Sequence, residues 1–248
     1  MSLALRASKA VQNGSCRFVA VLNPPYVDRG NYVLTLYSYW RSSAAYRVRI
    51  ALNLKGLAYE QVPVHLVKDG GQQHSAAYKA LNPQELLPLL VDEGHGGVKI
   101  AQSLAILEYL DEVFPETPLL PRDPLRRAQV RALALHIACD LHPLNNLRVL
   151  QYLTGELGVS EAAQDAWYQH WLHSGLAAVE AGLAPFEGGL SLGEQPGYLE
   201  ACLVPQLYNA RRFNCDLDAY PRILAMTARC ETLQAFAQAA PEVQPDAV

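Results

Sequence analysis

The sequence predicts a mixed α/β domain followed by an all-helical domain. Strand and helix patterns alternate after residue 31, whereas only helical patterns follow a proline-rich break at 115–121. Alternating strands and helices favour a sheet covered by helices, and clustered prolines are typical of a connection between domains. We therefore expect an N-terminal tail, a sheet domain, a linker and a helical domain over residues 1–31, 32–115, 116–122 and 123–248.

The sheet domain starts with an apolar strand at 32–37 that leads into a helix at 43–55. The helix is indicated by Ala45, Val48 and Leu52 at helical spacing and by Gly56 as a C-terminal stop. The pattern then predicts a strand at 59–65, a glycine turn at 69–71, a short helix at 75–81, an extended segment at 86–92, a strand at 98–100 and a helix at 103–114. The two closely spaced late strands predict a hairpin within a mixed sheet.

The helical domain opens at Asp123-Pro124, an N-cap followed by a proline in the first helical position. Its first helix is apolar on two faces, which is typical of a helix at the centre of a bundle. Pro143 must interrupt this helix, because proline lacks an N–H and clashes with the preceding turn. Further helices are expected at 145–152, 160–181, 198–213 and 221–239.

Composition limits the classes of function. The 248 residues carry a net charge of −4, so the charge balance does not point to nucleic acid or to an anionic membrane as a partner. The apolar runs are shorter than the ~18 residues of a membrane span. Five cysteines without a C-x-x-C pair argue against a disulfide framework and favour a reducing cytoplasm. His170 and His173 lie three residues apart but lack an acidic or cysteine partner, so we expect no metal.

Residues 1–31 differ from the rest, because they mix small residues with four basic side chains and a single acidic one, Asp28. A basic targeting peptide would have this balance, but the stretch has neither a clean hydrophobic segment nor a cleavage site. We expect a disordered tail or a start assigned too far upstream.

Two helix starts carry the candidate chemistry. Ser42 and Ser43 open the first helix, and Gln102-Ser103 opens the last helix of the sheet domain. The first N–H groups of a helix lack intrahelical partners, and the macrodipole adds about half a positive charge, so both starts can hold an anion. On the residues alone, capping is the simpler explanation of each start. Leu87-Pro88 begins an extended segment, and a cis bond there would let Leu87 present its backbone to a peptide ligand.

Five motifs occur together in a specific order. They are Tyr37-Ser-Tyr-Trp-Arg-Ser-Ser-Ala-Ala-Tyr-Arg-Val-Arg-Ile-Ala-Leu52, Asp69-Gly-Gly-Gln-Gln73, Leu81-Asn-Pro83 with Leu87-Pro88, Gln102-Ser-Leu-Ala-Ile106 and Gln244-Pro-Asp246. From Tyr32 to the C-terminus the chain resembles the zeta class of glutathione transferases. The resemblance implies the fold of that family: a thioredoxin-like N-terminal domain that binds glutathione and an all-helical C-terminal domain that shapes the second substrate's pocket. It also implies a homodimer.

The resemblance further implies roles for individual residues. Ser42 would hydrogen-bond the glutathione thiol, Ser43 would cap the helix and assist, and Asn146 would approach the sulfur. The rest of the cofactor would be held by Gln73, Leu87, Pro88, Gln102, Ser103 and His142, with Pro88 as the family's cis-proline. A thiol of pKa about 8.5 is only a few per cent ionised at neutral pH, and a hydroxyl donor at a helix N-terminus favours the thiolate.

The implied activity is glutathione-dependent cis–trans isomerisation of maleylacetoacetate to fumarylacetoacetate, in the breakdown of tyrosine and phenylalanine. A substrate with two carboxylates suits arginine, whose planar fork binds a carboxylate at two points. The candidates are Arg41 and Arg212, and the resemblance alone selects Arg212 over Arg211. The alternatives are isomerisation of maleylpyruvate, general glutathione conjugation or dehalogenation, and a non-catalytic glutathione-binding module.

Three positions depart from the family pattern. Leu147 stands where the enzymes acting on maleylpyruvate share an arginine, which favours maleylacetoacetate. Ala44 stands where many zeta-class proteins have cysteine, so we expect the glutathione sulfur to be the only nucleophile. Gly197 replaces the Ser or Thr of a capping box, so Glu200 is left to reach back to the backbone, with modest instability as the expected result.

Overall fold

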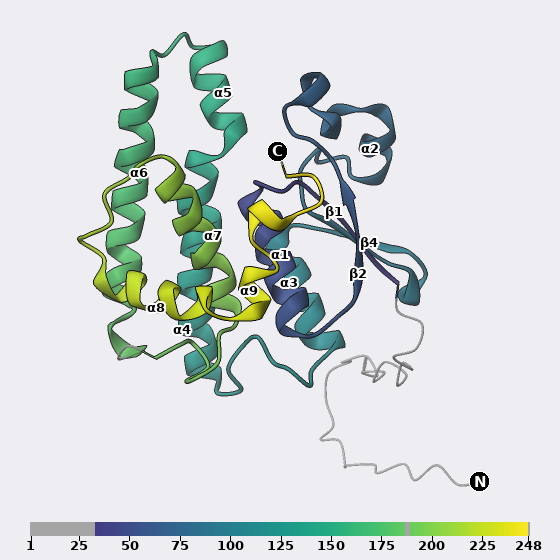
Figure 1. The fold of residues 1–248 in the computed structure, drawn as a ribbon, viewed down its shortest axis with the longest axis vertical. Helices are drawn as coiled ribbons and strands as arrows, with labels where there is room; N and C mark the ends of the chain where they lie inside the picture. Colours follow the sequence, from purple (N-terminus) through teal and green to yellow (C-terminus); the bar gives the residue numbers. More distant parts are fainter. Residues whose placement is uncertain (1–32, 187–188, 248) are drawn as a thin grey trace, which may run out of the picture. The chain divides into compact units, whose positions relative to one another are not determined.

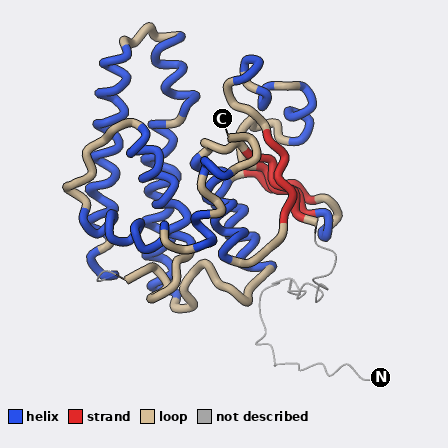
Figure 2. Tube along the Cα trace, in the orientation of Figure 1, coloured by secondary structure: helices blue, strands red, loops and turns tan. Residues whose placement is uncertain are grey.

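The computed structural model describes residues 33–186 and 189–247, so the tail predicted at 1–31 lies outside the described residues. The first part of the described chain carries a four-stranded sheet in the order β2-β1-β3-β4, and the rest is helical (Figures 1 and 2). This arrangement is the thioredoxin-like domain with a following helical part that the sequence predicts.

The sheet is mixed and is built around β1. β1 (Leu34–Ser38) pairs in parallel with β2 (Tyr59–Pro63) and antiparallel with β3 (Leu89–Asp92). β3 returns through a tight turn to β4 (Val98–Ala101), so the predicted hairpin is confirmed. The ladder starts at Leu89 rather than at residue 86, where the extended segment was expected to begin, because Pro88 has no N–H to donate.

Three helices belong to the sheet part. α1 (Ser43–Leu54) and α3 (Ser103–Val113) pack against each other between the sheet and the helical half, and α1 also packs on α7 (Figure 1). α2 (Ala76–Leu81) lies away from the helical half. α1 is buried on nearly every side, which places two arginines, Arg47 and Arg49, inside the protein.

The helical half contains α4 (Pro124–Leu135), α5 (Leu147–Gly155), α6 (Glu161–Gly182), α7 (Tyr198–Arg212), α8 (Pro221–Glu231) and α9 (Gln234–Ala237). Asp123 caps α4 through its side chain, with Pro124 in the first turn, as predicted. After α4 the chain widens into a π-helical segment, His136–Leu141, and then tightens into a 3₁₀ turn, His142–Asn145. Pro143 lies in this turn, so the predicted interruption is confirmed.

The single helix expected at 221–239 is wrong, because the structure has α8 and α9 there with a bend between them. The backbone of Leu233 is extended (φ −88°, ψ 137°), and its N–H donates to the carbonyl of Cys230. The bend allows Phe236 to be buried in the core. This stretch holds no Gly or Pro after Pro221, so the break has no local signal.

One continuous hydrophobic core joins the sheet part to the helical half. It runs from Leu36 and Leu90 of the sheet through Ile50 of α1 to Leu172 and Leu203 of the helices. Residues 116–122 contain no helix or strand, and Leu119 and Leu120 in this stretch are buried in the same core. Within the described ranges, no helix combines the length and the apolarity that crossing a membrane requires.

Candidate active site

Two adjacent cavities open between the helix starts and the helical half. The larger, about 560 Å³, is lined among others by Ser42, Gln73, Leu87, Pro88, Gln102, Ser103, His142 and Asn146. The smaller, about 120 Å³, is lined by Arg41, Ser43 and Arg212, and it shares Ser42, His142 and Asn146 with the larger cavity. The structure therefore brings every residue named as a candidate for glutathione or substrate binding to one of two neighbouring cavities, although they come from six separate stretches of the chain.

Ser42 is the N-cap of α1, which corrects the expectation that Ser43 caps the helix. The backbone of Ser42 is extended (φ −68°, ψ 113°), and its Oγ accepts a hydrogen bond from the Ala45 N–H at 3.2 Å. Ser43 is instead the first helical residue and is 7% exposed. Because capping uses only an acceptor lone pair of Ser42, its hydroxyl proton stays available to a ligand. Capping and thiol contact are thus compatible roles for one side chain.

Asn146 repeats this arrangement from the helical half. It is the N-cap of α5, and its Oδ1 accepts a hydrogen bond from the Arg148 N–H at 3.2 Å. Within the described residues its amide nitrogen makes no hydrogen bond, so it can donate to a ligand. The N-termini of α1, α3 and α5 all reach the larger cavity, so three helix dipoles favour a negative charge there.

Gln102 precedes α3 in a backbone conformation that few residues other than glycine adopt, with φ 70° and ψ 116°. Its side chain does not cap α3 but donates to Gln84 Oε1 at 2.6 Å. Strained backbone of this kind is concentrated at functional sites because surrounding contacts must hold it in place. Gln102 thereby fixes the start of α3, where Ser103 lies on the cavity wall.

Arg47 lines the larger cavity and was not singled out from the sequence. Its side chain is 2% exposed, and its Nη1 donates to Ser103 Oγ at 3.2 Å. Its Nε and Nη2 atoms have no partner within the described residues. A buried cation without a counter-ion is costly, so this wall of the cavity favours an anionic ligand. Because Ser103 accepts from Arg47, its own hydroxyl proton can point to that ligand.

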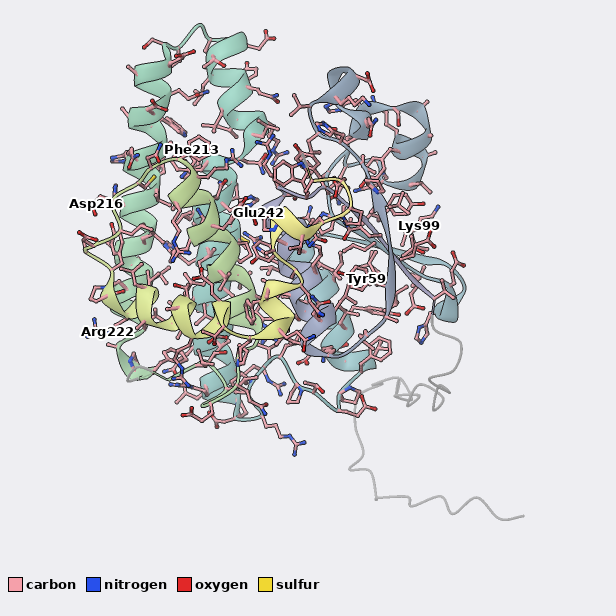
Figure 3. The ribbon with its side chains drawn as sticks, in the orientation of Figure 1. Tyr59, Lys99, Phe213, Asp216, Arg222 and Glu242 are labelled. Atoms are coloured by element: carbon pink, nitrogen blue, oxygen red, sulfur yellow. The ribbon has the colours of Figure 1, made fainter. Side chains whose placement is uncertain are left out.

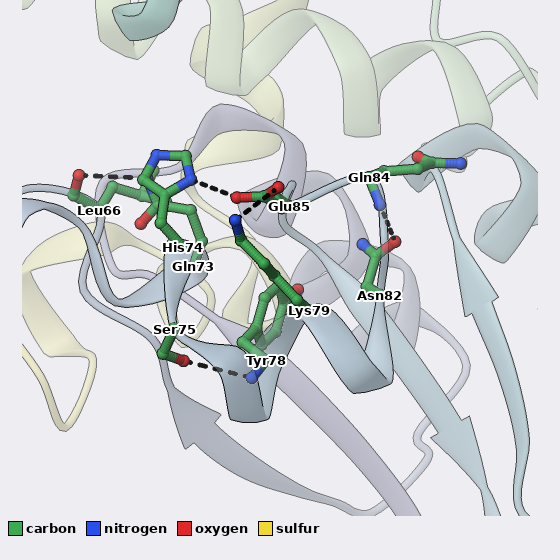
Figure 4. A network of polar contacts seen from close by, with 9 residues as sticks. All are labelled: Leu66, Gln73, His74, Ser75, Tyr78, Lys79, Asn82, Gln84 and Glu85. Carbon is green, nitrogen blue, oxygen red and sulfur yellow. Dashed lines mark hydrogen bonds and ion pairs between the residues drawn. The ribbon is translucent and has the colours of Figure 1, made fainter.

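Gln73 also lines the larger cavity, and it belongs to the polar network of Figure 4. Its Nε2 reaches the Leu66 carbonyl (3.5 Å) and His74 Nε2 (3.0 Å), whereas its buried Oε1 has no partner in the described chain. His74 Nδ1 contacts Glu85 Oε2 at 2.6 Å, and Lys79 pairs with the other oxygen of Glu85 at 3.2 Å. This part of the cavity wall is thus held by its own polar contacts, while Gln73 keeps one acceptor for a ligand N–H.

The Leu87–Pro88 peptide bond is cis, as the resemblance implies. Among the described residues, none forms a hydrogen bond to the Leu87 N–H or carbonyl. Leu87 lines the larger cavity, and its unused backbone groups can pair with an extended peptide.

Arg41 and Arg212 place positive charge at the smaller cavity. Arg41 donates to Tyr39 Oη at 3.2 Å and stacks over Trp40, and Arg212 stacks over Phe213, which Figure 3 labels beyond the end of α7. Neither arginine pairs with a carboxylate in the part of the chain that the structure describes. Desolvation and the like charge of Arg41 lower the pKa of Arg212. Two mutually repelling, unpaired guanidinium groups form a site for a carboxylate.

Arg211 has a different environment from Arg212, because its guanidinium pairs with Glu231 of α8. The structure therefore favours Arg212 over Arg211 as the residue that binds a carboxylate, a choice that the residues alone left open.

His142 is a neutral imidazole at the boundary of the two cavities. Burial, with Arg47 and Arg148 nearby, lowers its pKa to about 3. An imidazole with so low a pKa is a poor base at neutral pH, so His142 can only exchange hydrogen bonds with a ligand. The metal candidates of the sequence lie elsewhere: His173 bonds Tyr220 Oη (2.8 Å) and Gln169 Oε1 (3.1 Å).

A thioredoxin-like domain with an anion-attracting cavity at the start of α1 defines the class of protein, and comparisons with known proteins give the family. The N-terminal domain of glutathione S-transferases matches residues 32–112. The chain is 53% identical over 214 residues to the "Probable maleylacetoacetate isomerase" of Vibrio cholerae, across 86% of this chain and 98% of that protein. It is 48% identical over 216 residues to the maleylpyruvate isomerase of a Ralstonia species, across 86% and 99%.

Solved structures agree with these relatives. A holo maleylpyruvate isomerase, described as a bacterial glutathione S-transferase of the zeta class, superposes with a TM-score of 0.81 at 46% identity, covering 86% of this chain and 100% of that chain. A maleylacetoacetate isomerase from Anaeromyxobacter dehalogenans, with glutathione in its active site, superposes with a TM-score of 0.78 at 43% identity, covering 88% and 99%. This chain belongs to the glutathione S-transferase family, in its zeta class.

Proposed function

We propose that this protein catalyses the glutathione-dependent cis–trans isomerisation of maleylacetoacetate to fumarylacetoacetate, a step of tyrosine and phenylalanine breakdown. The observation that carries the proposal is the pair of adjoining cavities, which share Ser42, His142 and Asn146. One cavity has the groups that a tripeptide thiol needs, and the other has two unpaired arginines for a carboxylate. The names of the relatives in Vibrio cholerae and Anaeromyxobacter dehalogenans support the same substrate.

The residues of the larger cavity fit glutathione. Its carboxylates match the unpaired Nε and Nη2 of Arg47 and the hydroxyl of Ser103, and its amides match Gln73 Oε1 and the free backbone of Leu87. When bound, glutathione supplies a thiolate nucleophile that frees the cis double bond to rotate. Ser42 and Asn146 are the donors that we assign to the sulfur, and Ser43 lines the smaller cavity beside them.

Ionisation of the thiol requires stabilisation rather than a base. Lowering a thiol pKa by about two units corresponds to ~2.7 kcal/mol, which one charge-assisted hydrogen bond and the helix dipole can supply. Ser42 gives the hydrogen bond, and α1, α3 and α5 give the dipoles. His142 stays neutral and takes no proton, while Arg41 and Arg212 hold the substrate carboxylate.

The substrate assay compares maleylacetoacetate, maleylpyruvate and an electrophilic aromatic chloride, each with and without glutathione. We expect glutathione-dependent turnover of maleylacetoacetate above that of maleylpyruvate, because Leu147 lines both cavities in place of a third arginine. Faster turnover of maleylpyruvate would assign the protein to that substrate. Turnover of the chloride alone would identify a general transferase, and binding without any turnover would identify a non-catalytic module.

Ser42→Ala should lower kcat roughly 10- to 100-fold, because loss of a hydrogen bond to a charged group costs about 1.5–3 kcal/mol. Ser75→Ala is a matched control, since Ser75 caps α2 with the same geometry (Tyr78 N–H to Oγ, 3.2 Å) and lines neither cavity. Both variants lose a helix cap, but only Ser42→Ala loses the donor to the sulfur. Unchanged kcat in Ser42→Ala would show that Ser43 or Asn146 makes the contact instead.

We also propose that the protein is a homodimer and that it is located in the cytoplasm. Family membership supports the dimer, and Leu125 of α4 is an exposed apolar residue that lines neither cavity. The free thiols of the four described cysteines support a reducing compartment. Light scattering on the purified protein tests the oligomeric state.

A further inference from the structure

Cys139 places a protein thiol in the cavity where glutathione is proposed to bind. It lies in the π-helical segment between α4 and the 3₁₀ turn, is exposed, and lines the larger cavity together with Ser42 and Ser103. The sequence suggested that the glutathione sulfur would be the only nucleophile, because α1 carries Ala44 where relatives have cysteine. The structure instead brings a cysteine to the cavity from the helical half.

The other described cysteines cannot compete with Cys139. Cys202, Cys215 and Cys230 are buried, and burial raises the pKa of the first two to about 11 and that of Cys230 further. A thiol that is both buried and protonated is inert toward disulfides. Within the described ranges, Cys139 is therefore the reactive thiol.

Two polar groups in the same cavity point independently to a ligand beside Cys139. Arg47 (2% exposed) keeps Nε and Nη2 unpartnered, and Gln73 (9% exposed) keeps Oε1 unpartnered. Arg47 and Cys139 line the same cavity. The cavity can thus hold the carboxylate and amide groups of a glutathionyl unit beside Cys139.

We propose that Cys139 is a modification site that forms a reversible mixed disulfide with glutathione, using glutathione disulfide as the co-reactant. This inference rests on the proposed function, because it needs the cavity to bind a glutathionyl unit. The Cys139 thiolate attacks one sulfur of the disulfide, the old S–S bond breaks, and a new bond joins Sγ to that sulfur. The second glutathione leaves as a thiolate and takes up the proton that Cys139 lost. Cys139 is oxidised, the departing glutathione is reduced, and the tethered unit occupies the cavity.

The test treats the purified full-length protein with glutathione disulfide and follows intact mass, peptide mass and isomerase activity. We expect one added glutathionyl unit, mapped to Cys139, with activity lost in proportion to the modified fraction and recovered with a thiol reductant. Cys139→Ser should take up no unit at the mapped peptide and should keep its own starting activity during treatment. Modification elsewhere, or inactivation of Cys139→Ser at the wild-type rate, would overturn the proposal.

A second experiment tests whether the cavity recognises glutathione disulfide or whether Cys139 reacts only because it is exposed. The rate with glutathione disulfide should saturate and should fall when S-methylglutathione is present, whereas bis(2-hydroxyethyl) disulfide, which lacks carboxylates, should react slowly. Gln73→Ala should slow only the reaction with glutathione disulfide. Equal rates with both disulfides, or no protection by S-methylglutathione, would overturn the proposal.

Calorimetry with S-methylglutathione distinguishes failure of the mixed disulfide at Cys139 from failure of the proposed glutathione-dependent function. Binding without modification of Cys139 would overturn the mixed disulfide and leave the proposed function standing. Absence of binding would overturn both.

Discussion

His142 shows how strongly the surroundings of a single residue set its charge. Its pKa of about 3 in the fold is far below the ~6.5 of an unfolded chain, because burial and the two neighbouring arginines oppose a third positive charge. Between these two values the unfolded chain binds the proton and the folded protein does not. Stability contributed by this group is therefore complete above about pH 6.5 and is lost as the pH falls toward 3.

The resulting prediction concerns acid sensitivity. His142 should make the free energy of unfolding fall by up to ~1.4 kcal/mol per pH unit below pH 6.5. His142→Gln, which cannot be protonated, should flatten the dependence by that amount. Denaturant unfolding at pH 7, 6 and 5 measures the slope for both proteins, and an equal slope would contradict a depressed pKa at His142.

The residues of the site differ in how far the sequence could predict them. Ser42 and Ser103 could be found from the residues because each lies at a helix start, whereas Asn146 was indicated by the family resemblance. Arg47 and Cys139 could not, because they reach the same cavity only through packing of segments about ninety residues apart in the sequence. The capping residue of α1 was also assigned one position late, since either serine satisfies the pattern.

At the scale of elements, Gly197 has a positive reason to be glycine. A Cβ built there would lie 2.3 Å from the Leu119 carbonyl oxygen, which accepts the Tyr198 N–H at 2.8 Å. The reach-back expected of Glu200 is confirmed, because its Oε2 accepts the Gly197 N–H at 2.8 Å. Ser or Thr is therefore absent at position 197 because Leu119 of the linker approaches the start of α7 too closely for a side chain.

Gly197→Ala and Gly197→Ser should both lower the free energy of unfolding, by about 1–3 kcal/mol, because the added atom forces the linker carbonyl away. Gly155→Ala is a suitable control, since Gly155 is helical and has no atom within 4 Å of a built Cβ. That control should gain about 0.5–1 kcal/mol. A higher melting temperature for Gly197→Ser would instead restore the lost-cap explanation.

Most elements could be predicted from the sequence, and those that could not depend on contacts between distant segments. The order of strands and helices in the sheet part follows from local periodicity, proline and glycine. The bend between α8 and α9 follows from burial of Phe236 and has no local signal. The π-helical segment before Pro143 could not be predicted either, because the proline predicts that the helix is interrupted but not that the interruption is π-helical.

At the scale of the whole molecule, the C-terminal segment holds the loop that carries Arg41 and leads to Ser42. The Trp40 N–H donates to Asp246 Oδ2 at 3.0 Å, and the buried Arg49 joins the Trp40 carbonyl (3.0 Å) to the Ala239 carbonyl (3.0 Å). Burial lowers the pKa of Arg49 to about 10, so it remains charged at neutral pH. Glu242, labelled in Figure 3, accepts from Tyr208 Oη at 2.7 Å and fixes the same segment to α7.

Asp246→Ala should therefore disturb the site from the far end of the chain. Loss of a hydrogen bond to a charged group should lower the free energy of unfolding by about 1–3 kcal/mol. Because the freed loop carries Arg41, KM for the dicarboxylate substrate should rise, whereas KM for a neutral electrophile should not. Asp218→Ala, at an exposed residue between α7 and α8, is the control and should change neither quantity. A lower free energy of unfolding with unchanged KM for the dicarboxylate would limit Asp246 to a structural role. If neither the free energy of unfolding nor KM changed, the loop would hold its place without the C-terminal segment.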